Sequence, residues 1–122
     1  MSKQANEAER SLRLMFPDLE TEVGLQKITK SMLHRGIRVD FYIPSKCLLI
    51  ECHGIQHFRP SSFGRSKVDT LMQFNRQQNR DDRLIRICKQ FNINYEQIDY
   101  NEDVSYASLF RKFEKYLNED RD

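Results

Sequence analysis

Two neighbouring stretches of the chain are apolar over strand length and are separated by a turn. The first runs over 37–43 and the second over 47–52, with Pro44, Ser45 and Lys46 between them. Runs of this length on either side of a Pro- and Ser-containing turn are typical of a hairpin. The pattern therefore predicts two adjacent strands in the middle of the chain.

Ionisable side chains interrupt both predicted strands. Because successive strand residues point to opposite faces, Asp40 shares a face with Tyr42, and Glu51 shares a face with His53. The other face of the hairpin carries Val39, Phe41, Ile43, Leu48, Ile50 and Cys52. Ionised groups are costly to bury unless they are paired or bind a metal, so two carboxylates and a histidine within a sheet indicate a metal-dependent site.

The segments around the hairpin have helical or strand periodicity in turn. They predict a helix over 3–16, an edge strand over 19–23, a long helix over 68–91, a strand over 94–98 and a helix over 104–117. The apolar row of the last helix comprises Tyr106, Leu109, Phe110, Phe113 and Leu117. A strand reached through a crossover helix is expected to pair in parallel with the strand before it. The predicted fold is α/β, with a mixed four-stranded sheet flanked by helices.

The long predicted helix places an acidic residue among apolar ones. Its inward row comprises Leu71, Phe74, Gln78, Asp81, Ile85 and Cys88, whereas Asp82 falls on the outer face. A buried carboxylate without a partner would destabilise the fold by several kcal/mol, so Asp81 is expected to have one. A histidine is the natural candidate for that partner.

The first predicted helix also carries a carboxylate on its apolar side. Glu9 lies on the row formed by Ala5, Leu12 and Phe16. Two interpretations are open: Glu9 reaches solvent from the edge of the row, or it contributes to a functional site. Glu7 is the second acidic candidate on this helix.

Length and composition indicate a single domain, 1–122, large enough for one hydrophobic core. The net charge of +2 favours a nucleic-acid partner only weakly. The sequence has no apolar run of membrane-spanning length and no signal-peptide pattern, and its odd number of cysteines fits reduced thiols. A soluble, cytoplasmic protein is therefore expected.

Cysteine and histidine spacing offers structural zinc as an alternative chemistry, through Cys47, Cys52, His53 and His57. The two cysteines are five residues apart on one predicted strand, so they point to opposite faces of the sheet. Side chains on opposite faces cannot meet at one tetrahedral ion, which argues against this site.

The hairpin motifs resemble a known nuclease family. The patterns D-F-Y-x-P and L-L-I-E-x-x-G-x-Q-H, followed by Arg80-Asp81 on the long helix, resemble the very-short-patch-repair-like endonucleases. That family is a branch of the PD-(D/E)xK superfamily and includes phage homing endonucleases with an EDxHD motif. The resemblance covers about Glu9 to Cys88 and implies a restriction-endonuclease-like core. One departure is Glu51-Cys52-His53-Gly54 in place of E-x-K, so a lysine-based mechanism does not carry over.

The resemblance implies a metal-dependent site. Asp40 would bind a divalent cation, with Mg²⁺ as the expected ion, and the main-chain carbonyl of Cys52 would add a ligand. Glu9 and Glu51 would position water on the ion, and Glu51 is also a candidate ligand of the metal. Glu51 is the less secure of these assignments, because the mismatch-repair members have an apolar residue there.

The resemblance also implies a general base. His57, held in one tautomer by Asp81, would activate the attacking water, and His53 would stabilise or protonate the leaving oxygen. The candidate catalytic residues are thus Glu9, Asp40, His53, His57 and Asp81. The candidate DNA-binding residues are Arg59, Arg65, Lys67, Arg76 and Arg80.

The expected function is metal-dependent hydrolysis of DNA phosphodiester bonds by the catalytic domain of a phage homing endonuclease. A mismatch-repair or restriction nuclease of the same fold and a non-catalytic DNA-binding module are the alternatives. Double-stranded DNA is the expected partner, no membrane is involved, and the host-cell cytoplasm is the expected location if a phage encodes the chain. The sequence leaves open a homodimer and a further DNA-recognition domain outside this chain.

Overall fold

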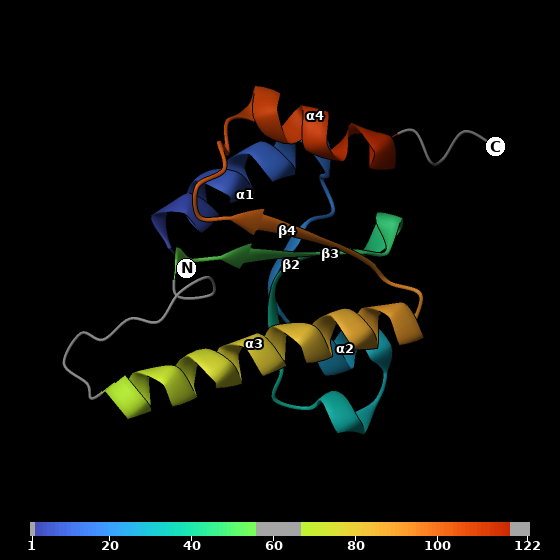
Figure 1. Ribbon diagram of the computed structural model, residues 1–122. Coiled ribbons are helices and arrows are strands. Elements are labelled where there is room, and N and C mark those ends of the chain that lie inside the picture. Colours follow the sequence, from blue (N-terminus) through green and yellow to red (C-terminus); the bar gives the residue numbers. More distant parts are fainter. Residues whose placement is uncertain (1, 56–66, 118–122) are drawn as a thin grey trace.

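The computed structural model describes residues 2–55 and 67–117. It is an α/β structure in which helices cover both faces of one four-stranded sheet (Figure 1). The main elements are α1 (Lys3–Met15), β1 (Glu20–Gly24), α2 (Leu25–Thr29), β2 (Arg38–Ile43), β3 (Leu48–His53), α3 (Lys67–Gln90), β4 (Asn94–Asp99) and α4 (Tyr106–Leu117). Two short 3₁₀ turns, η1 (Met32–His34) and η2 (Pro44–Lys46), precede β2 and β3.

The sheet has the strand order β1-β2-β3-β4. The first three strands form an antiparallel meander, and β4 pairs in parallel with β3 after the chain crosses through α3. The predicted mixed sheet and the parallel crossover are therefore confirmed. In the parallel pair, Glu51 lies beside Gln97 and His53 beside Asp99.

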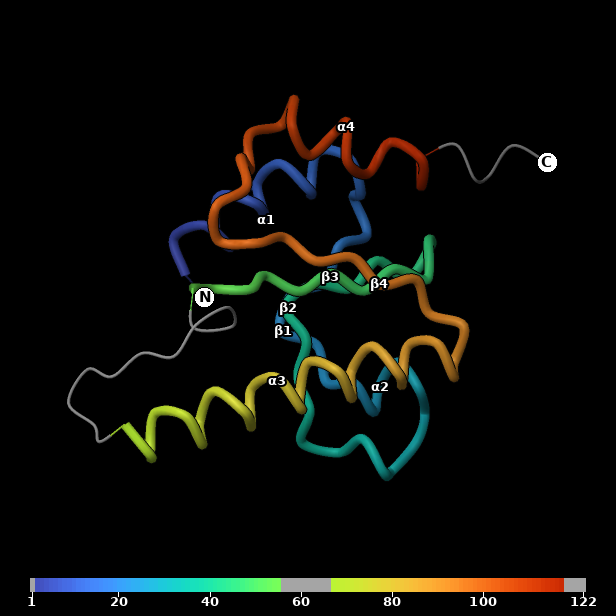
Figure 2. The backbone as a smooth tube through the Cα atoms, in the orientation of Figure 1, coloured from blue at the N-terminus to red at the C-terminus, as the bar shows by residue number. Residues whose placement is uncertain are grey.

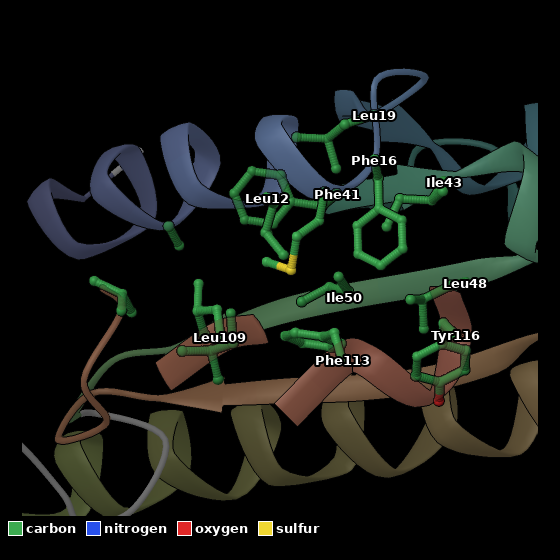
Figure 3. Packing of buried hydrophobic residues seen from close by; sticks show 14 of the residues in the cluster. Leu12, Phe16, Leu19, Phe41, Ile43, Leu48, Ile50, Leu109, Phe113 and Tyr116 are labelled. Atoms are coloured by element: carbon green, nitrogen blue, oxygen red, sulfur yellow. The ribbon is translucent and has the colours of Figure 1, made fainter. Parts of the chain in front are cut away.

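One face of the sheet packs against α1 and α4. Figure 3 shows this cluster, in which Leu12 and Phe16 from α1 and its C-terminal end meet Ile50 of β3 and Phe113 of α4. Ser2 caps α1 by accepting a hydrogen bond from the Ala5 N–H at 3.1 Å. Among the described residues, the buried side chains of this layer are apolar apart from Ser11, so the layer holds the sheet mainly through apolar packing.

The other face packs against α3 and the short helix α2. Its buried cluster comprises Val23, Leu25, Val39, Leu49, Leu84, Ile87, Cys88 and Ile93. Only the C-terminal half of α3 contributes to this cluster, and Figure 2 shows the N-terminal end of α3 extending past the sheet. None of the described helices is long and apolar enough to cross a membrane.

Strand β2 does not keep its apolar residues on one face, contrary to the prediction from alternation. Phe41 and Ile43 lie in the α1–α4 cluster, but Val39 lies in the α3 cluster. The change occurs at Asp40, whose neighbour position on β1 is Glu22 with a left-handed φ of 51°. The strand pairing is irregular at that point, so the start of β2 turns towards α3.

The predicted apolar rows of the helices also need correction. In α3 the inward positions are Thr70, Phe74, Gln77, Asp81, Leu84, Ile87 and Cys88, whereas Leu71 is exposed. In α4 the buried residues are Leu109, Phe113 and Tyr116, whereas Tyr106 and Phe110 are exposed. The helix α2 was not predicted from the sequence.

The contrast between two phenylalanines of α4 tests this packing. Phe113 is fully buried and Phe110 is 37% exposed, so Phe113→Ala is expected to lower the free energy of unfolding by about 3–5 kcal/mol. Phe110→Ala is expected to cost about 1 kcal/mol or less. Urea unfolding of both variants measures the difference, and equal losses would contradict the assigned helix face.

Candidate active site

Two carboxylates replace main-chain hydrogen bonds between β2 and β3. The regular ladder between these strands ends at the pair Phe41 and Ile50. At the next position, the Glu51 Oε2 accepts a hydrogen bond from the Asp40 N–H at 2.7 Å, and the Asp40 Oδ2 accepts one from the Cys52 N–H at 2.8 Å. The two strands are therefore clamped by side chains where they begin to separate.

Cys52 contributes its main chain to this site and its side chain to the opposite layer. The thiol packs against the α1–α4 cluster, while Cys47 packs against the α3 cluster. The two cysteines thus lie on opposite faces of the sheet, as the sequence predicts. Because the N–H and C=O of one strand residue point to the same side, the Cys52 carbonyl also faces β2.

Helix α3 adds a third acid. Asp81 lines a cleft together with Asp40 and Glu51, and its Oδ1 accepts a hydrogen bond from the Gln77 side-chain amide at 3.0 Å. Asp82 is exposed and does not line this cleft. The predicted helical position of Asp81 is therefore confirmed.

The cleft has a volume of about 590 Å³ and lies between α3 and the start of β2. Three acids, Asp40, Glu51 and Asp81, share it with three cations. The cationic residues are Arg38 on β2 and Arg80 and Arg83 on α3. Acids surrounded by arginines suit a ligand that combines a cation with an anionic group.

Glu51 has a strongly perturbed acidity. Burial raises its pKa from the ordinary 4.5 to about 8, and the negative charge of Asp40 adds to the rise, with a smaller effect from Asp81. Hydrogen bonding from the Asp40 N–H acts in the opposite direction but does not cancel these effects. At neutral pH without a cation, the neutral form of Glu51 is therefore favoured.

The donor set fits a hard divalent cation. It consists of the Asp40 and Glu51 carboxylates and the Cys52 carbonyl, and Mg²⁺ prefers oxygen donors while keeping much of its own water. Within residues 2–55 and 67–117, no three His, Cys, Asp or Glu side chains group closely enough to bind a metal ion by themselves. A site of two carboxylates and one carbonyl is consistent with that observation.

His53 lies beside this cleft but is not part of its lining. The imidazole is 5% exposed, and its Nε2 is 3.3 Å from the Tyr95 hydroxyl on β4. Burial, followed by the charges of Glu51 and Asp81, raises the pKa of Tyr95. The Tyr95 hydroxyl therefore keeps its proton.

Glu9 is not brought to the cleft. Its carboxylate pairs with Arg13 at 3.0 Å on α1, which covers the opposite face of the sheet from α3 (Figure 1). The buried row of α1 comprises Ala5, Ala8, Ser11, Leu12 and Met15. This row places Glu9 at the edge of the helix, which agrees with the solvent-edge interpretation, and Glu9 does not line the cleft.

The other sequence candidates divide into three groups. Arg80 lines the cleft, whereas Lys67 and Arg76 are exposed on α3 and do not line it. His57, Arg59 and Arg65 lie outside the described residues. Their assignments stay predictions.

Several residues of this region were not predicted from the sequence. Gln77 holds Asp81, and a Gln four residues before an Asp on a helix is a recognisable signal for that contact. Arg38 and Arg83 line the cleft, and Tyr95 contacts His53. No local sequence pattern predicts the position of Tyr95, because the parallel pairing of β3 and β4 brings it next to His53.

Comparison with known proteins found no matching family model, no matching curated protein and no matching solved structure. A function for the site therefore rests on its geometry and on the motifs of the chain.

The acidity of Glu51 predicts a pH-dependent stability. The folded chain binds this proton more tightly than the unfolded chain, so the free energy of unfolding falls as pH rises from about 4.5 to 8, by up to about 1.4 kcal/mol per pH unit. Glu51→Gln mimics the protonated acid and should remove this part of the slope, making the variant more stable than wild type at pH 8. Urea unfolding in EDTA between pH 5 and 8 measures it.

Glu114→Gln serves as the control, because Glu114 is exposed on α4 and remote from the cleft in sequence and layer. The difference in free energy of unfolding between Glu114→Gln and wild type should not change between pH 5 and 8. If the difference in free energy of unfolding between Glu51→Gln and wild type also stayed constant with pH, this would contradict the raised pKa of Glu51.

Proposed function

We propose that this chain is a metal-dependent DNA endonuclease that hydrolyses phosphodiester bonds. The observation that carries the proposal is the pair of carboxylates, Asp40 and Glu51, held by main-chain N–H groups at the point where two strands separate. Asp81 faces the same cleft. The motif resemblance to the very-short-patch-repair-like endonucleases, with a restriction-endonuclease-like core, adds independent support.

A divalent cation is the natural counter-ion for this site. Glu51 favours its protonated form because it is buried and because the charges of Asp40 and Asp81 are near it, so a cation can replace that proton and relieve the repulsion. Asp40, Glu51 and the Cys52 carbonyl would hold the ion, with Mg²⁺ as the expected species. When bound, it would supply Lewis-acid stabilisation of the charge that develops on the phosphate.

The protein side chains handle the protons. Under this proposal His57 takes the proton of the attacking water, and Asp81 orients the imidazole and stabilises its charged form. Gln77 restricts the Asp81 carboxylate by donating to its Oδ1. His53 acts at the leaving oxygen.

The arginines of the cleft fit a polyanionic substrate. Arg38, Arg80 and Arg83 flank the three acids, so phosphates next to the hydrolysed bond would meet guanidinium groups. The net charge of +2 is small, and this local distribution is what favours DNA. A homing role would require recognition surfaces beyond this cleft.

Asp40→Asn tests the metal role. The amide oxygen can still accept the Cys52 N–H, whereas Asp40→Ala would leave that donor without its partner at a cost of about 1–3 kcal/mol. Asp40→Asn is expected to abolish nicking of supercoiled plasmid in Mg²⁺ and to weaken Mg²⁺ binding measured by calorimetry. EDTA should abolish nicking by the wild-type chain.

Asp18→Asn is a matched control, because Asp18 also accepts a main-chain N–H, from Ser45 at 2.8 Å, but does not line the cleft. This variant should nick at the wild-type rate. Mg²⁺-dependent nicking by Asp40→Asn at the control rate would overturn the metal assignment. DNA binding without any nicking by the wild-type chain would instead favour a non-catalytic DNA-binding module.

Asp81→Asn tests the orienting carboxylate. The variant keeps the side-chain shape but removes the charge that stabilises an imidazolium, so the cleavage rate should fall about 100-fold or more with little change in DNA affinity. Asp82→Asn, one residue along on the exposed face of α3, should cleave normally. Equal rates for the two variants, in single-turnover cleavage, would argue against a role for Asp81.

A further inference from the structure

A chain of polar side chains crosses from β3 to β4 on the α3 face of the sheet. It joins His53, Tyr95, Gln97 and Asp99, and these four residues are called the polar chain below. The Tyr95 hydroxyl lies 3.3 Å from the His53 Nε2 and 3.3 Å from the Gln97 Oε1. The Gln97 Nε2 donates to the Asp99 Oδ1 at 2.7 Å.

The direction of every hydrogen bond in the polar chain follows from its acidic end. A carboxylate can only accept, so the Gln97 atom next to Asp99 must be the amide nitrogen. The opposite orientation of the amide would place two oxygens 2.7 Å apart. The Gln97 Oε1 therefore faces Tyr95 and accepts the hydroxyl proton.

This arrangement determines which nitrogen of His53 carries hydrogen. Tyr95 has one hydroxyl proton and donates it to Gln97, so only a lone pair of its oxygen faces His53. A bond to that lone pair requires hydrogen on the His53 Nε2. Tyr95 cannot take the donor role towards His53 without giving up its bond to Gln97.

The strand pairing keeps the polar chain in register. His53 and Asp99 are partners in the parallel pair of β3 and β4, and Glu51 is the partner of Gln97. The imidazole is buried, and Tyr95, Gln97 and Asp99 are partly buried. Water competes poorly for hydrogen bonds in such a position, so the chosen tautomer is stabilised.

We infer that Tyr95, Gln97 and Asp99 are positioning residues that hold neutral His53 protonated on Nε2, so that its catalytic proton is carried on Nδ1. The catalytic role of His53 in this inference rests on the proposed function. When protonated His53 gives its Nδ1 proton to the leaving oxygen, the phosphorus–oxygen bond breaks, a hydroxyl forms, and His53 returns to the Nε2–H tautomer. Hydrogen-bond partners of this kind fix the reactive nitrogen of a histidine.

The tautomer can be measured without any cleavage assay. In ¹⁵N-labelled protein at a pH where imidazoles are neutral, long-range ¹H–¹⁵N correlations should show the wild-type His53 protonated on Nε2. Gln97→Met removes the acceptor of the Tyr95 hydroxyl, which can then donate to His53 and reverse the tautomer to Nδ1–H. Tyr95→Phe removes the hydrogen bond to Nε2 and should lower the fraction of the Nε2–H tautomer.

Tyr42→Phe is the matched control, because Tyr42 lies on the same side of the sheet and contacts Cys47 outside the polar chain. Its His53 signals should equal those of wild type, and thermal unfolding verifies that each variant folds. A wild-type His53 protonated on Nδ1, or an unchanged tautomer in Gln97→Met, would overturn the inference.

Cleavage kinetics test the role at the reaction separately. Gln97→Met is expected to lower kcat about 10- to 100-fold with KM unchanged, in line with the loss of a histidine's orienting partner. An unchanged kcat together with a reversed tautomer would overturn the positioning role. Failure of the wild-type chain to cleave would overturn the proposed function alone, because the NMR result does not depend on DNA.

Discussion

The arrangement of this site depends on an exchange of hydrogen bonds at one position of the sheet. Between β2 and β3 the main-chain ladder stops after Phe41 and Ile50, and the Asp40 and Glu51 carboxylates accept the next two N–H groups. The exchange satisfies the backbone while the strands separate, and it fixes two acids against each other. Burial, together with the nearby charge of Asp40, raises the pKa of Glu51 so that it holds a proton, and the closeness of the two acids makes the pair suitable for a cation.

The two faces of the sheet differ in polarity, and the candidate site lies on the α3 face. Among the described residues, the buried side chains of the α1–α4 layer are apolar apart from Ser11, whereas the α3 layer has an apolar cluster shared with α2 and a polar cleft. Cys52 belongs to both, with a thiol in the first layer and its main chain at the site. A change in side-chain packing on the α1–α4 face can therefore reach the site through the backbone of β3, and also through that of β2, which places Phe41 in this layer next to Asp40 at the site.

Much of the fold and the acidic core of the site could be predicted, because both follow the alternation of strand residues and the helical repeat. Alternation placed Glu51 and His53 on one face, and helical spacing separated Asp81 from Asp82. The predictions failed where tertiary contacts override the period. The irregular pairing at Glu22 moved Val39 to the other layer. The buried row of α1 places Glu9 at the helix edge, one of the two positions that the sequence left open. Tyr95 could not be predicted from a local pattern.

The two parts of the site differ in how far apart their residues lie along the chain. The contact from Asp40 to Glu51 closes 11 residues, so it can form with the hairpin itself. The contact from His53 to Tyr95 closes 42 residues and needs the crossover through α3. Because loop-closure entropy delays contacts of high sequence separation, the acids should assemble early in folding and the histidine last. A nascent or partly unfolded chain would then hold its carboxylate pair before His53 is oriented, which makes orientation of the imidazole a marker of the completed fold.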